Sequence, residues 1–460
     1  MKLYNTKSRE IEEFKPQKEG VVTMYACGPT VYDFTHIGHM RKYIGDDILR
    51  RTLSYLGYDV KHVMNITDVG HLTNDSDEGD DKFENKAKSE GKSVWDIASL
   101  YTDYFHESMR SVNVLPPNIA EAKATDHVSQ MIEMVEKLLT KGHAYETENA
   151  IYFDIKSFPE YGSLSGQKLS DKSLGVREDV VIDKDKKNPA DFVLWFKRVG
   201  RFANHSMYWP SPWGEGFPGW HIECSAMSIH YLGETIDIHT GGIDHIPVHH
   251  ENEIAQSVCT TGHDFVKYWV HYAFLNVDGE KMSKSKHNYY TISDIEGHNI
   301  NPLAMRLLCM QTSYRKPINF TWEALSVAEL QLNKLRLFTS IKETLGNIIL
   351  DYKNKFIEAL SDDLNTAKAL AVVWEMTSDE KYSREDRYKT LLSFDEVLGL
   401  DLAGVKEFTI SSEAKELLEK MKEAREQKNY ELSDSIRNEL ELLGYKVEQS
   451  SQGVSLSPIL

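Results

Sequence analysis

The sequence lacks the features that mark membrane-spanning, secreted and disulfide-stabilised proteins. Its 460 residues contain no apolar run that approaches the roughly 18 residues of a membrane-spanning helix. The first residues, MKLYNTKSREIEEF, include no apolar segment that could act as a secretory signal. Only four cysteines are present, and none forms a CxxC pair. We therefore expect a protein of the reducing cytoplasm that does not associate with membranes.

Basic residues are also scarce relative to acidic ones. The 53 Lys and Arg residues face 71 Asp and Glu residues, which gives a net charge of −18. Nucleic acid would therefore have to bind in a local basic groove, against a repulsive overall field. The length exceeds that of one ordinary hydrophobic core. Composition thus predicts a multidomain protein and slightly disfavours a nucleic-acid partner.

The first clear pattern is a βαβ unit. The stretch GVVTMYACGPT is typical of a strand, which Gly28 and Pro29 end. Apolar residues then recur at helical spacing from Gly38 until Gly57, and DVKHVMNIT is typical of a second strand. Such units build parallel sheets that bind ligands at the carboxyl ends of their strands.

The rest of the chain predicts an α/β protein with a helical carboxyl-terminal region. We expect an exposed, mobile loop over the acidic residues 68–92, helices over 94–142, and then an insertion rich in Pro, Gly and Trp that closes over the sheet. TIDIHTGG predicts a further strand and VHHENEIAQSVCTTG a further helix. Helical spacing dominates residues 322–443.

Two histidines and two lysines are candidates for phosphate chemistry. His36 and His39, in THIGH, lie where the predicted strand leads into the helix. A helix amino terminus offers unpaired N–H groups to phosphate, and the rings add further donors. Lys281 and Lys284, in DGEKMSKSKHN, place two ammonium groups on a short loop, where they can stabilise charge moving across a triphosphate. Taken singly, the motifs also fit surface histidines and a solvated charge run.

A metal site is the second candidate. Eight of the 18 histidines fall between residues 221 and 271. On a helix, His249 and Glu253 would share one face and could reach a single ion. Cys27 and Cys224 could complete a zinc site of two thiolates, one imidazole and one carboxylate. Spacing alone does not bring these cysteines together, and a single cysteine is more often a small buried apolar residue.

The order of these motifs resembles a known family. HIGH after a first strand, followed by KMSKS, is similar to the paired signature of the class I aminoacyl-tRNA synthetases. MYACGPTVYD, GWHIECSAMS, HHENEIAQS and DDLNTAKAL further resemble the cysteinyl-tRNA synthetases, and this likeness runs from near residue 3 to beyond residue 440. The resemblance implies that the chain activates L-cysteine with ATP and Mg²⁺ to cysteinyl-adenylate and transfers the cysteinyl group to the 3′ end of tRNA-Cys.

The resemblance also implies a role for each matching residue. One zinc ion per chain, at the bottom of the cysteine pocket, would be held by Cys27, Cys224, His249 and Glu253. Zinc prefers a soft thiolate to a hydroxyl, so it would favour cysteine over serine. The catalytic residues would be His36, His39, Lys281 and Lys284.

Further positions of the family's pocket match this sequence. Cysteine contacts would come from Thr67, Trp220 and His239, and ATP contacts from Gly38, Asp244 and Lys284. Two of these have structural alternatives, because Trp220 could fill the core and Asp244 could cap the helix that carries His249. Cys259 and Cys309 match no ligand position, and we expect both in the core.

The family's plan implies a Rossmann-type parallel-sheet catalytic domain with an insertion, followed by a helical tRNA-binding region. The expected parts are the first catalytic half (1–115), the connective insertion (116–215), the second catalytic half (216–275), the KMSKS loop and stem-contact region (276–320), a helical bundle (321–400) and an anticodon-binding region (401–460). Residues 413–446 carry seven basic and nine acidic side chains. Aromatic stacking and a few cations, including Arg425, Lys428 and Arg437, would therefore contact the anticodon. We expect a monomer.

The sequence departs from the family at four places. NITDVGHL stands where NITDVDD is usual, His245 and Pro247 are atypical, and Lys286-His287 replaces the common LGN. The tail SQGVSLSPIL lacks the usual tryptophan and terminal basic residues, which leaves the details of anticodon contact open. None of these differences removes a proposed ligand.

Two alternatives remain open at this point. A cysteine ligase paralogue that acts on an amino-sugar would lack the anticodon-binding region, whereas helical spacing here continues to residue 443. A non-catalytic RNA-binding zinc protein would leave the HIGH and KMSKS motifs unexplained. A zinc protease is excluded, because no histidine lies four residues after His249 or His250.

Overall fold

A five-stranded parallel sheet forms the centre of the molecule, with strand order β14-β13-β3-β4-β7. The computed structural model describes residues 1–74, 78–167, 186–283, 286, 288–406, 411–443, 445–450 and 453–458. The sheet contains β3 (Val21–Ala26), β4 (Asp59–Ile66), β7 (Ala120–Lys123), β13 (Ile236–Gly242) and β14 (Val266–Tyr272). Chain order reverses between β3 and β13, which makes their carboxyl ends the switch point where doubly wound sheets bind ligands. The predicted Rossmann-type fold is confirmed.

Helix α1 (Ile37–Tyr55) joins β3 to β4 and confirms the predicted βαβ unit. The Nδ1 atom of His36 accepts a hydrogen bond from the backbone N–H of His39 at 3.2 Å, so the first histidine of HIGH caps the helix. Met40 and Ile44 are buried on its inner face. Gly57, at a φ of +94°, turns the chain after the helix, a conformation that favours glycine. The helix therefore starts at the ligand-binding edge of the sheet.

The segment after β4 differs from the prediction. In place of an exposed loop over 68–92, the described residues form the hairpin β5 (Leu72–Asn74) and β6 (Glu78–Asp81), then α2 (Lys82–Glu90). The helix α3 (Val94–Ser111) follows, as predicted. Buried Leu72 and Phe83 anchor this segment despite its acidic composition. The expectation of helix throughout 94–142 is also wrong, because β7 pairs with β4 at the sheet edge.

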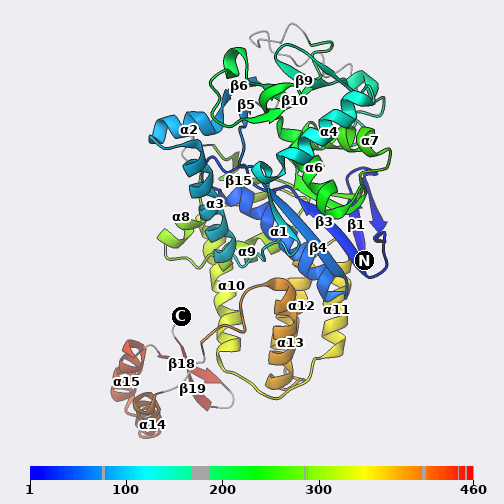
Figure 1. Cartoon of the computed structure of the whole chain (residues 1–460). Coiled ribbons are helices and arrows are strands. Elements are labelled where there is room, and N and C mark those ends of the chain that lie inside the picture. The colour runs from blue at the N-terminus through cyan, green and yellow to red at the C-terminus, as the bar shows by residue number, and fades with distance from the viewer. Residues whose placement is uncertain are drawn as a thin grey trace.

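The insertion forms a second sheet of five antiparallel strands, ordered β11-β12-β10-β9-β8. It lies above the parallel sheet in Figure 1. Its strands are β8 (Ala144–Glu146), β9 (Ala150–Phe153), β10 (Phe192–Lys197), β11 (Trp209–Ser211) and β12 (Gly214–Pro218). The helices α4 (Val128–Thr140), α6 (Trp220–Leu232) and α7 (His249–Thr261) connect it with the parallel sheet or cover that sheet.

Short elements surround the sheet on its remaining sides. A hairpin of β1 (Lys2–Asn5) and β2 (Glu10–Glu13) precedes β3. The helices α8 (Ile292–Gly297) and α9 (Leu303–Met310) lie in the chain between the second and third strands of a three-stranded sheet. That sheet has the order β16-β15-β17 and contains β15 (Leu275–Val277), β16 (Glu280–Lys281) and β17 (Ile318–Phe320).

The carboxyl-terminal part is mainly helical, as predicted, and forms two groups in Figure 1. The first group contains α10 (Trp322–Ser340), α11 (Leu350–Ser361), α12 (Thr366–Ser378) and α13 (Arg384–Leu398). The second contains α14 (Ser412–Glu426), α15 (Tyr430–Leu442), β18 (Tyr445–Ser450) and β19 (Gly453–Pro458). The final hairpin is an addition to the helical prediction. Across the described ranges, no helix is both long and apolar enough to span a membrane.

Candidate active site and metal centre

A cavity of about 350 Å³ opens at the carboxyl ends of β3 and β13. Its lining comes from segments that are far apart in the sequence, and includes Cys27, His36, Gly38, His39, Trp220, Cys224, Asp244, His249 and Lys281. The HIGH helix and the start of KMSKS therefore border the same cavity as two cysteines. This is the location expected for the ligand site of a doubly wound sheet.

Four side chains with metal-binding atoms converge at the floor of this cavity. One potential ligand atom from each of Cys27, Cys224, His249 and Glu253 lies within 4.8 Å of the others. All four residues are buried, with 3% or less of their surface exposed. Cys27 directly follows β3, Cys224 lies in α6, and α7 carries His249 and Glu253. The helical spacing of the latter two places His249 Nε2 2.9 Å from Glu253 Oε1.

The charges at the floor depend on one another. Burial alone would raise the pKa of Glu253, but the imidazoles of His239 and His249 lower it well below its usual range. Burial alone would lower the pKa of His249, but the Glu253 carboxylate raises it to about 10. Burial raises the pKa of both the Cys27 and the Cys224 thiols. The site therefore keeps the carboxylate ionised and disfavours free thiolates.

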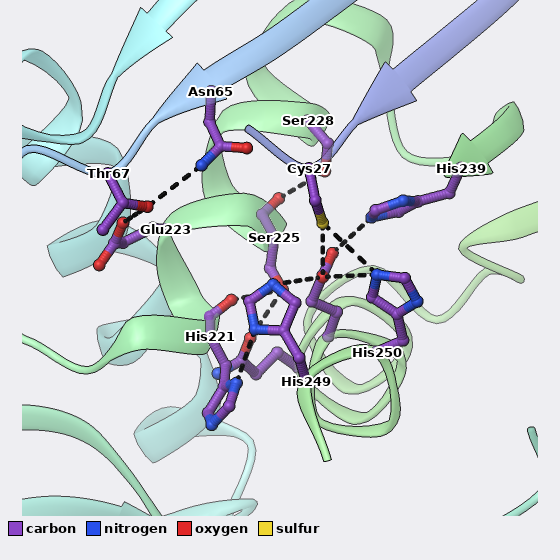
Figure 2. A network of polar contacts seen from close by, with 12 residues as sticks. Cys27, Asn65, Thr67, His221, Glu223, Ser225, Ser228, His239, His249 and His250 are labelled. Carbon is purple, nitrogen blue, oxygen red and sulfur yellow. Dashed lines mark hydrogen bonds and ion pairs between the residues drawn. The ribbon is translucent and has the colours of Figure 1, made fainter. Parts of the chain in front are cut away.

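Three further histidines contact side chains of the converging group and help to orient them. His239 Nε2 lies 2.8 Å from Glu253 Oε2, and His221 Nδ1 lies 2.9 Å from His249 Nδ1. His250 Nε2 lies 3.4 Å from the Cys27 sulfur. Figure 2 shows Cys27, His239, His249 and His250 pointing towards one another. Sequence reasoning missed the parts played by His221 and His250, although the concentration of histidines in this region was the available signal.

The donor set fits zinc on its own chemistry. Two sulfur atoms, an imidazole nitrogen and a carboxylate oxygen are all common zinc donors. The second imidazole nitrogen of His249 meets another side chain, as is usual for histidines that bind metals. Cys27, Glu253, His239 and His250 also approach one another within 4.8 Å. His239 and His250 thus surround the same two donors, Cys27 and Glu253.

The rim of the cavity carries the predicted phosphate-binding groups. The His36 and His39 rings stack with centroids 3.6 Å apart. A Cβ atom at Gly38 would lie 2.4 Å from Met282 Cε and 2.9 Å from the His36 ring, so only glycine lets these side chains approach so closely. Lys281 lines the cavity. The HIGH turn and the KMSKS segment are therefore neighbours, while Lys284 lies outside the described residues.

Of the residues expected to contact the substrates, some line the cavity and others lie behind its lining. Trp220 lines the cavity and stacks on His249 at a centroid distance of 4.3 Å. Asp244 also lines the cavity, and it is exposed. It does not cap α7, whose preceding residue is Val248. Thr67 Oγ1 donates to Glu223 Oε2 at 2.7 Å, and His239 is fully buried against Glu253. Thr67 and His239 thus lie behind the lining rather than on it.

Two more residues that line the cavity were not predicted from the sequence. Lys42, one turn after His39 in α1, and His71, just before β5, both line the cavity. Each lies in a segment for which the sequence suggested only helix or loop. Among the cysteines outside the cluster, Cys259 is buried as expected, whereas Cys309 is only partly buried. All four cysteines are free.

Family profiles match most of the chain. The profile described as tRNA synthetases class I (C) catalytic domain matches residues 13–330, and the DALR domain profile matches residues 355–403. Among solved structures, a Mycobacterium tuberculosis methionyl-tRNA synthetase with methionyl-adenylate has a TM-score of 0.56 at 14% identity, over 83% of this chain and 90% of the other. An Agrobacterium radiobacter LeuRS in a ternary complex with tRNA has a TM-score of 0.60 at 13% identity, over 85% of each chain. The fold and the matched domain define a class I aminoacyl-tRNA synthetase.

Curated relatives narrow this class. A cysteine--tRNA ligase of Treponema denticola is 41% identical over 98% of both chains, and one of Thermus thermophilus is 41% identical over 98% of both chains. The chain therefore belongs to the cysteine--tRNA ligase family. This match over nearly the whole length disfavours the amino-sugar ligase and the non-catalytic RNA-binding alternatives.

Proposed function

We propose that the chain is an ATP-dependent ligase that attaches cysteine to tRNA-Cys and uses zinc to select cysteine. In the first step a carboxylate oxygen of cysteine attacks the α-phosphorus of ATP, and pyrophosphate leaves. In the second, a hydroxyl of the terminal tRNA ribose takes the cysteinyl group and AMP leaves. Such chemistry needs positioning and charge stabilisation rather than a protein nucleophile.

The convergence of Cys27, Cys224, His249 and Glu253 beneath the HIGH helix is the observation that supports this function best. These four residues would hold one zinc ion. When bound, zinc would offer the cysteine sulfur a soft Lewis acid that a serine hydroxyl matches poorly. An apolar pocket alone separates substrates that differ by one small group by only about 10- to 200-fold.

The rim residues would act on ATP. We propose that His36 and His39 donate to its phosphates beside the α1 amino terminus, while Lys281 and Lys284 neutralise the leaving pyrophosphate. Gly38 would give the nucleotide close access to the backbone, and Asp244 would bind the ribose. ATP would enter with Mg²⁺.

The amino-acid side of the pocket would hold cysteine in place. We propose that Trp220 packs against the cysteine side chain, from its position on the cavity wall. His239 would act from behind by holding Glu253, and Thr67 would act near the substrate amino group through its contact with Glu223.

The larger organisation remains a prediction. Residues 116–215 would form the connective insertion between catalytic halves 1–115 and 216–275, and 276–320 would carry the KMSKS loop and contact the tRNA stem. Residues 321–400 would form the helical bundle and 401–460 the anticodon-binding region. We also propose a cytoplasmic monomer, and the free cysteines fit a reducing compartment.

Zinc content and amino-acid-dependent exchange of pyrophosphate into ATP test the function together. The purified chain should carry one zinc and support exchange with cysteine, with serine slower by on the order of 10⁴-fold. Cys224→Ser should lose zinc and cysteine-dependent exchange together, because it removes a sulfur donor. Lys284→Ala should keep zinc and slow exchange.

Cys259→Ser is the matched control, because Cys259 is a buried free cysteine outside the cluster. It should retain zinc and cysteine selectivity. A Cys224→Ser protein with normal zinc and a normal KM for cysteine would refute the ligand assignment. Absence of cysteine-dependent exchange in the unaltered chain would refute the ligase function itself.

A further inference from the structure

A buried lysine lies between the HIGH helix and the cluster at the floor. Lys42 is 9% exposed, lines the cavity, and lies one helical turn after His39 in α1. Its ammonium group donates a hydrogen bond to the backbone carbonyl of Cys27 and lies 2.7 Å from Asp46 Oδ2. The Lys42 and Asp46 side chains are 11% and 5% exposed. A cation and its counter-ion thus lie next to a proposed metal ligand.

Lys42 completes the hydrogen bonding of the Cys27 backbone. Cys27 comes directly after the last residue of β3, and its N–H still donates to the Thr240 carbonyl of β13 at 3.1 Å. The Cys27 carbonyl accepts from Lys42. The next residue, Gly28, donates its N–H to Asn65 Oδ1 at 2.6 Å. The position of the Cys27 sulfur therefore depends on α1 as well as on the sheet.

The charge balance at the floor gives Lys42 a second effect. Ionised Cys27, Cys224 and Glu253 would carry three negative charges against the two positive charges of zinc. A cysteine that enters as its thiolate would add another negative charge. Charges interact more strongly in a buried site than in water. The ammonium group, which contacts the Cys27 carbonyl directly, therefore favours this anionic assembly, and its counter-ion Asp46 opposes that effect only in part.

Stability alone is a poor explanation for a buried pair of this kind. Removing two charges from water costs several kcal/mol per ion, and apolar side chains of similar volume often replace such a pair without loss of stability. The Lys42–Asp46 pair therefore calls for an effect on zinc or cysteine binding in addition to any effect on the stability of the fold. Asp46, four residues after Lys42 in α1, would keep the ammonium group aimed at Cys27.

We propose that Lys42, oriented by Asp46, is a positioning residue that holds the Cys27 end of β3 and supplies the positive charge that favours a thiolate substrate at the metal centre. This rests on the proposed zinc-dependent cysteine site. It adds a link from the helix that would bind ATP to the ligands that would select cysteine.

The central variant is Lys42→Met, which keeps a long side chain and removes the charge. We expect its affinity for zinc, measured by competition with a chelator, to fall by about 10- to 100-fold, as for other groups that support metal ligands. The KM for cysteine in pyrophosphate exchange should rise, while the KM for ATP should stay within about twofold. Cysteine should also cause a smaller change in the visible absorption of the cobalt-substituted protein.

The double variant Lys42→Met/Asp46→Leu separates charge from stability. Replacing both ions with apolar side chains should restore the thermal midpoint if the single variant lowers it. The zinc affinity and the KM for cysteine should nevertheless recover only in part, because the Cys27 carbonyl still lacks its hydrogen bond from the Lys42 ammonium group. This double variant also tests the proposal if Lys42→Met alone fails to fold.

Lys141→Met is a control with matched chemistry, since Lys141 Nζ donates to the backbone carbonyl of another cysteine, Cys259, at 3.2 Å. It should leave zinc affinity and the KM for cysteine unchanged. Normal zinc affinity and cysteine KM in Lys42→Met, their full recovery in the double variant, or an equal effect in Lys141→Met would each overturn the role of Lys42. If the unaltered chain lacks zinc or cysteine-dependent exchange, the proposed function fails instead.

Discussion

The floor and the rim of one cavity differ in burial, in chain origin and in the kind of group they present. At the floor, Cys27, Cys224, His249 and Glu253 are at most 3% exposed, and they come from a strand end and two helices. At the rim, His39, Asp244 and Lys281 are exposed. Cys27, Cys224 and His249 line the same cavity as these rim residues.

Under the proposed function, this difference would separate selection of the amino acid at the floor from the reaction with ATP at the rim. At the floor, the buried Glu253 and His249 keep each other charged, so these ionised groups face one another even without a substrate. Groups at the rim reach solvent and can follow a large, hydrated triphosphate. We therefore expect substitutions at the floor to change metal binding and amino-acid choice, and substitutions at the rim to change the rate of activation.

Glu253→Gln should disrupt the cluster at the floor of the cavity, and we expect it to have the largest effect on stability and on zinc binding. Without the carboxylate, the buried His239 and His249 imidazoles lose the anion 2.8 and 2.9 Å away. Loss of one partner from a buried charged network costs about 3–5 kcal/mol. Urea unfolding followed by tryptophan fluorescence should report this destabilisation, and zinc should no longer co-purify.

Glu375→Gln is the control, because Glu375 pairs with Lys355 at 2.9 Å on the surface. Its unfolding midpoint should hardly change, since exposed ion pairs contribute little. Zinc retention and a parent-like midpoint in Glu253→Gln would show that the floor does not work as a coupled cluster.

His39→Ala should slow the reaction at the rim of the cavity and leave zinc binding at the floor unchanged. Removing one well-placed donor to a reacting phosphate should slow cysteine-dependent pyrophosphate exchange by about 10²- to 10³-fold. Zinc content should stay at the parent value, because His39 is not among the converging donors. His263→Ala, at an exposed histidine paired with Glu234, should change neither quantity. Zinc loss in His39→Ala would contradict the separation of floor and rim.

Asp81→Asn should have the smallest effect, and one that depends on pH. Asp81 caps α2 and its Oδ2 atom lies 3.2 Å from His205 Nε2 of the insertion. Burial alone would lower the pKa of His205, but Asp81 raises it above its ordinary value. A raised pKa stabilises the fold fully below the unfolded pKa of about 6.5, and this stabilisation disappears as pH rises through the folded pKa.

The thermal midpoint of Asp81→Asn should therefore fall below that of the parent by about 2–4 °C at pH 6. The difference should shrink as the pH rises through the raised pKa of His205, because the imidazole then becomes neutral. Asparagine still caps the helix, so the substitution removes mainly the charge. A difference that does not change with pH would exclude the His205–Asp81 ion pair as its cause.

Strong local patterns gave reliable predictions. Apolar residues at helical spacing and a β-branched run predicted β3, α1 and β4, and TIDIHTGG and VHHENEIAQS predicted β13 and α7. The HIGH and KMSKS motifs pointed to a class I synthetase, which the family match confirms. Each single element or motif among these signals spans about 20 residues or fewer, the range over which secondary structure reflects the sequence directly.

Weak local patterns gave the errors. The acidic segment 68–92 has few apolar residues, and its hairpin and helix depend on burial of Leu72 and Phe83 against distant parts of the chain. The four residues of β7 show no strand pattern of their own and depend on pairing with β4. Lys42 was one more residue in a predicted helix, and its contact with Cys27 depends on how α1 packs on the sheet.

By itself the sequence determined the βαβ order, the helical spacing of His249 and Glu253, and the residue types that can bind phosphate or a soft metal. The tertiary structure alone decided that Cys27 and Cys224, 197 positions apart in the sequence, meet at one point with Lys42 beside them. The physical reason is range, because hydrogen bonds along a helix or turn link near neighbours, whereas burial of the sheet and its helices brings distant residues together.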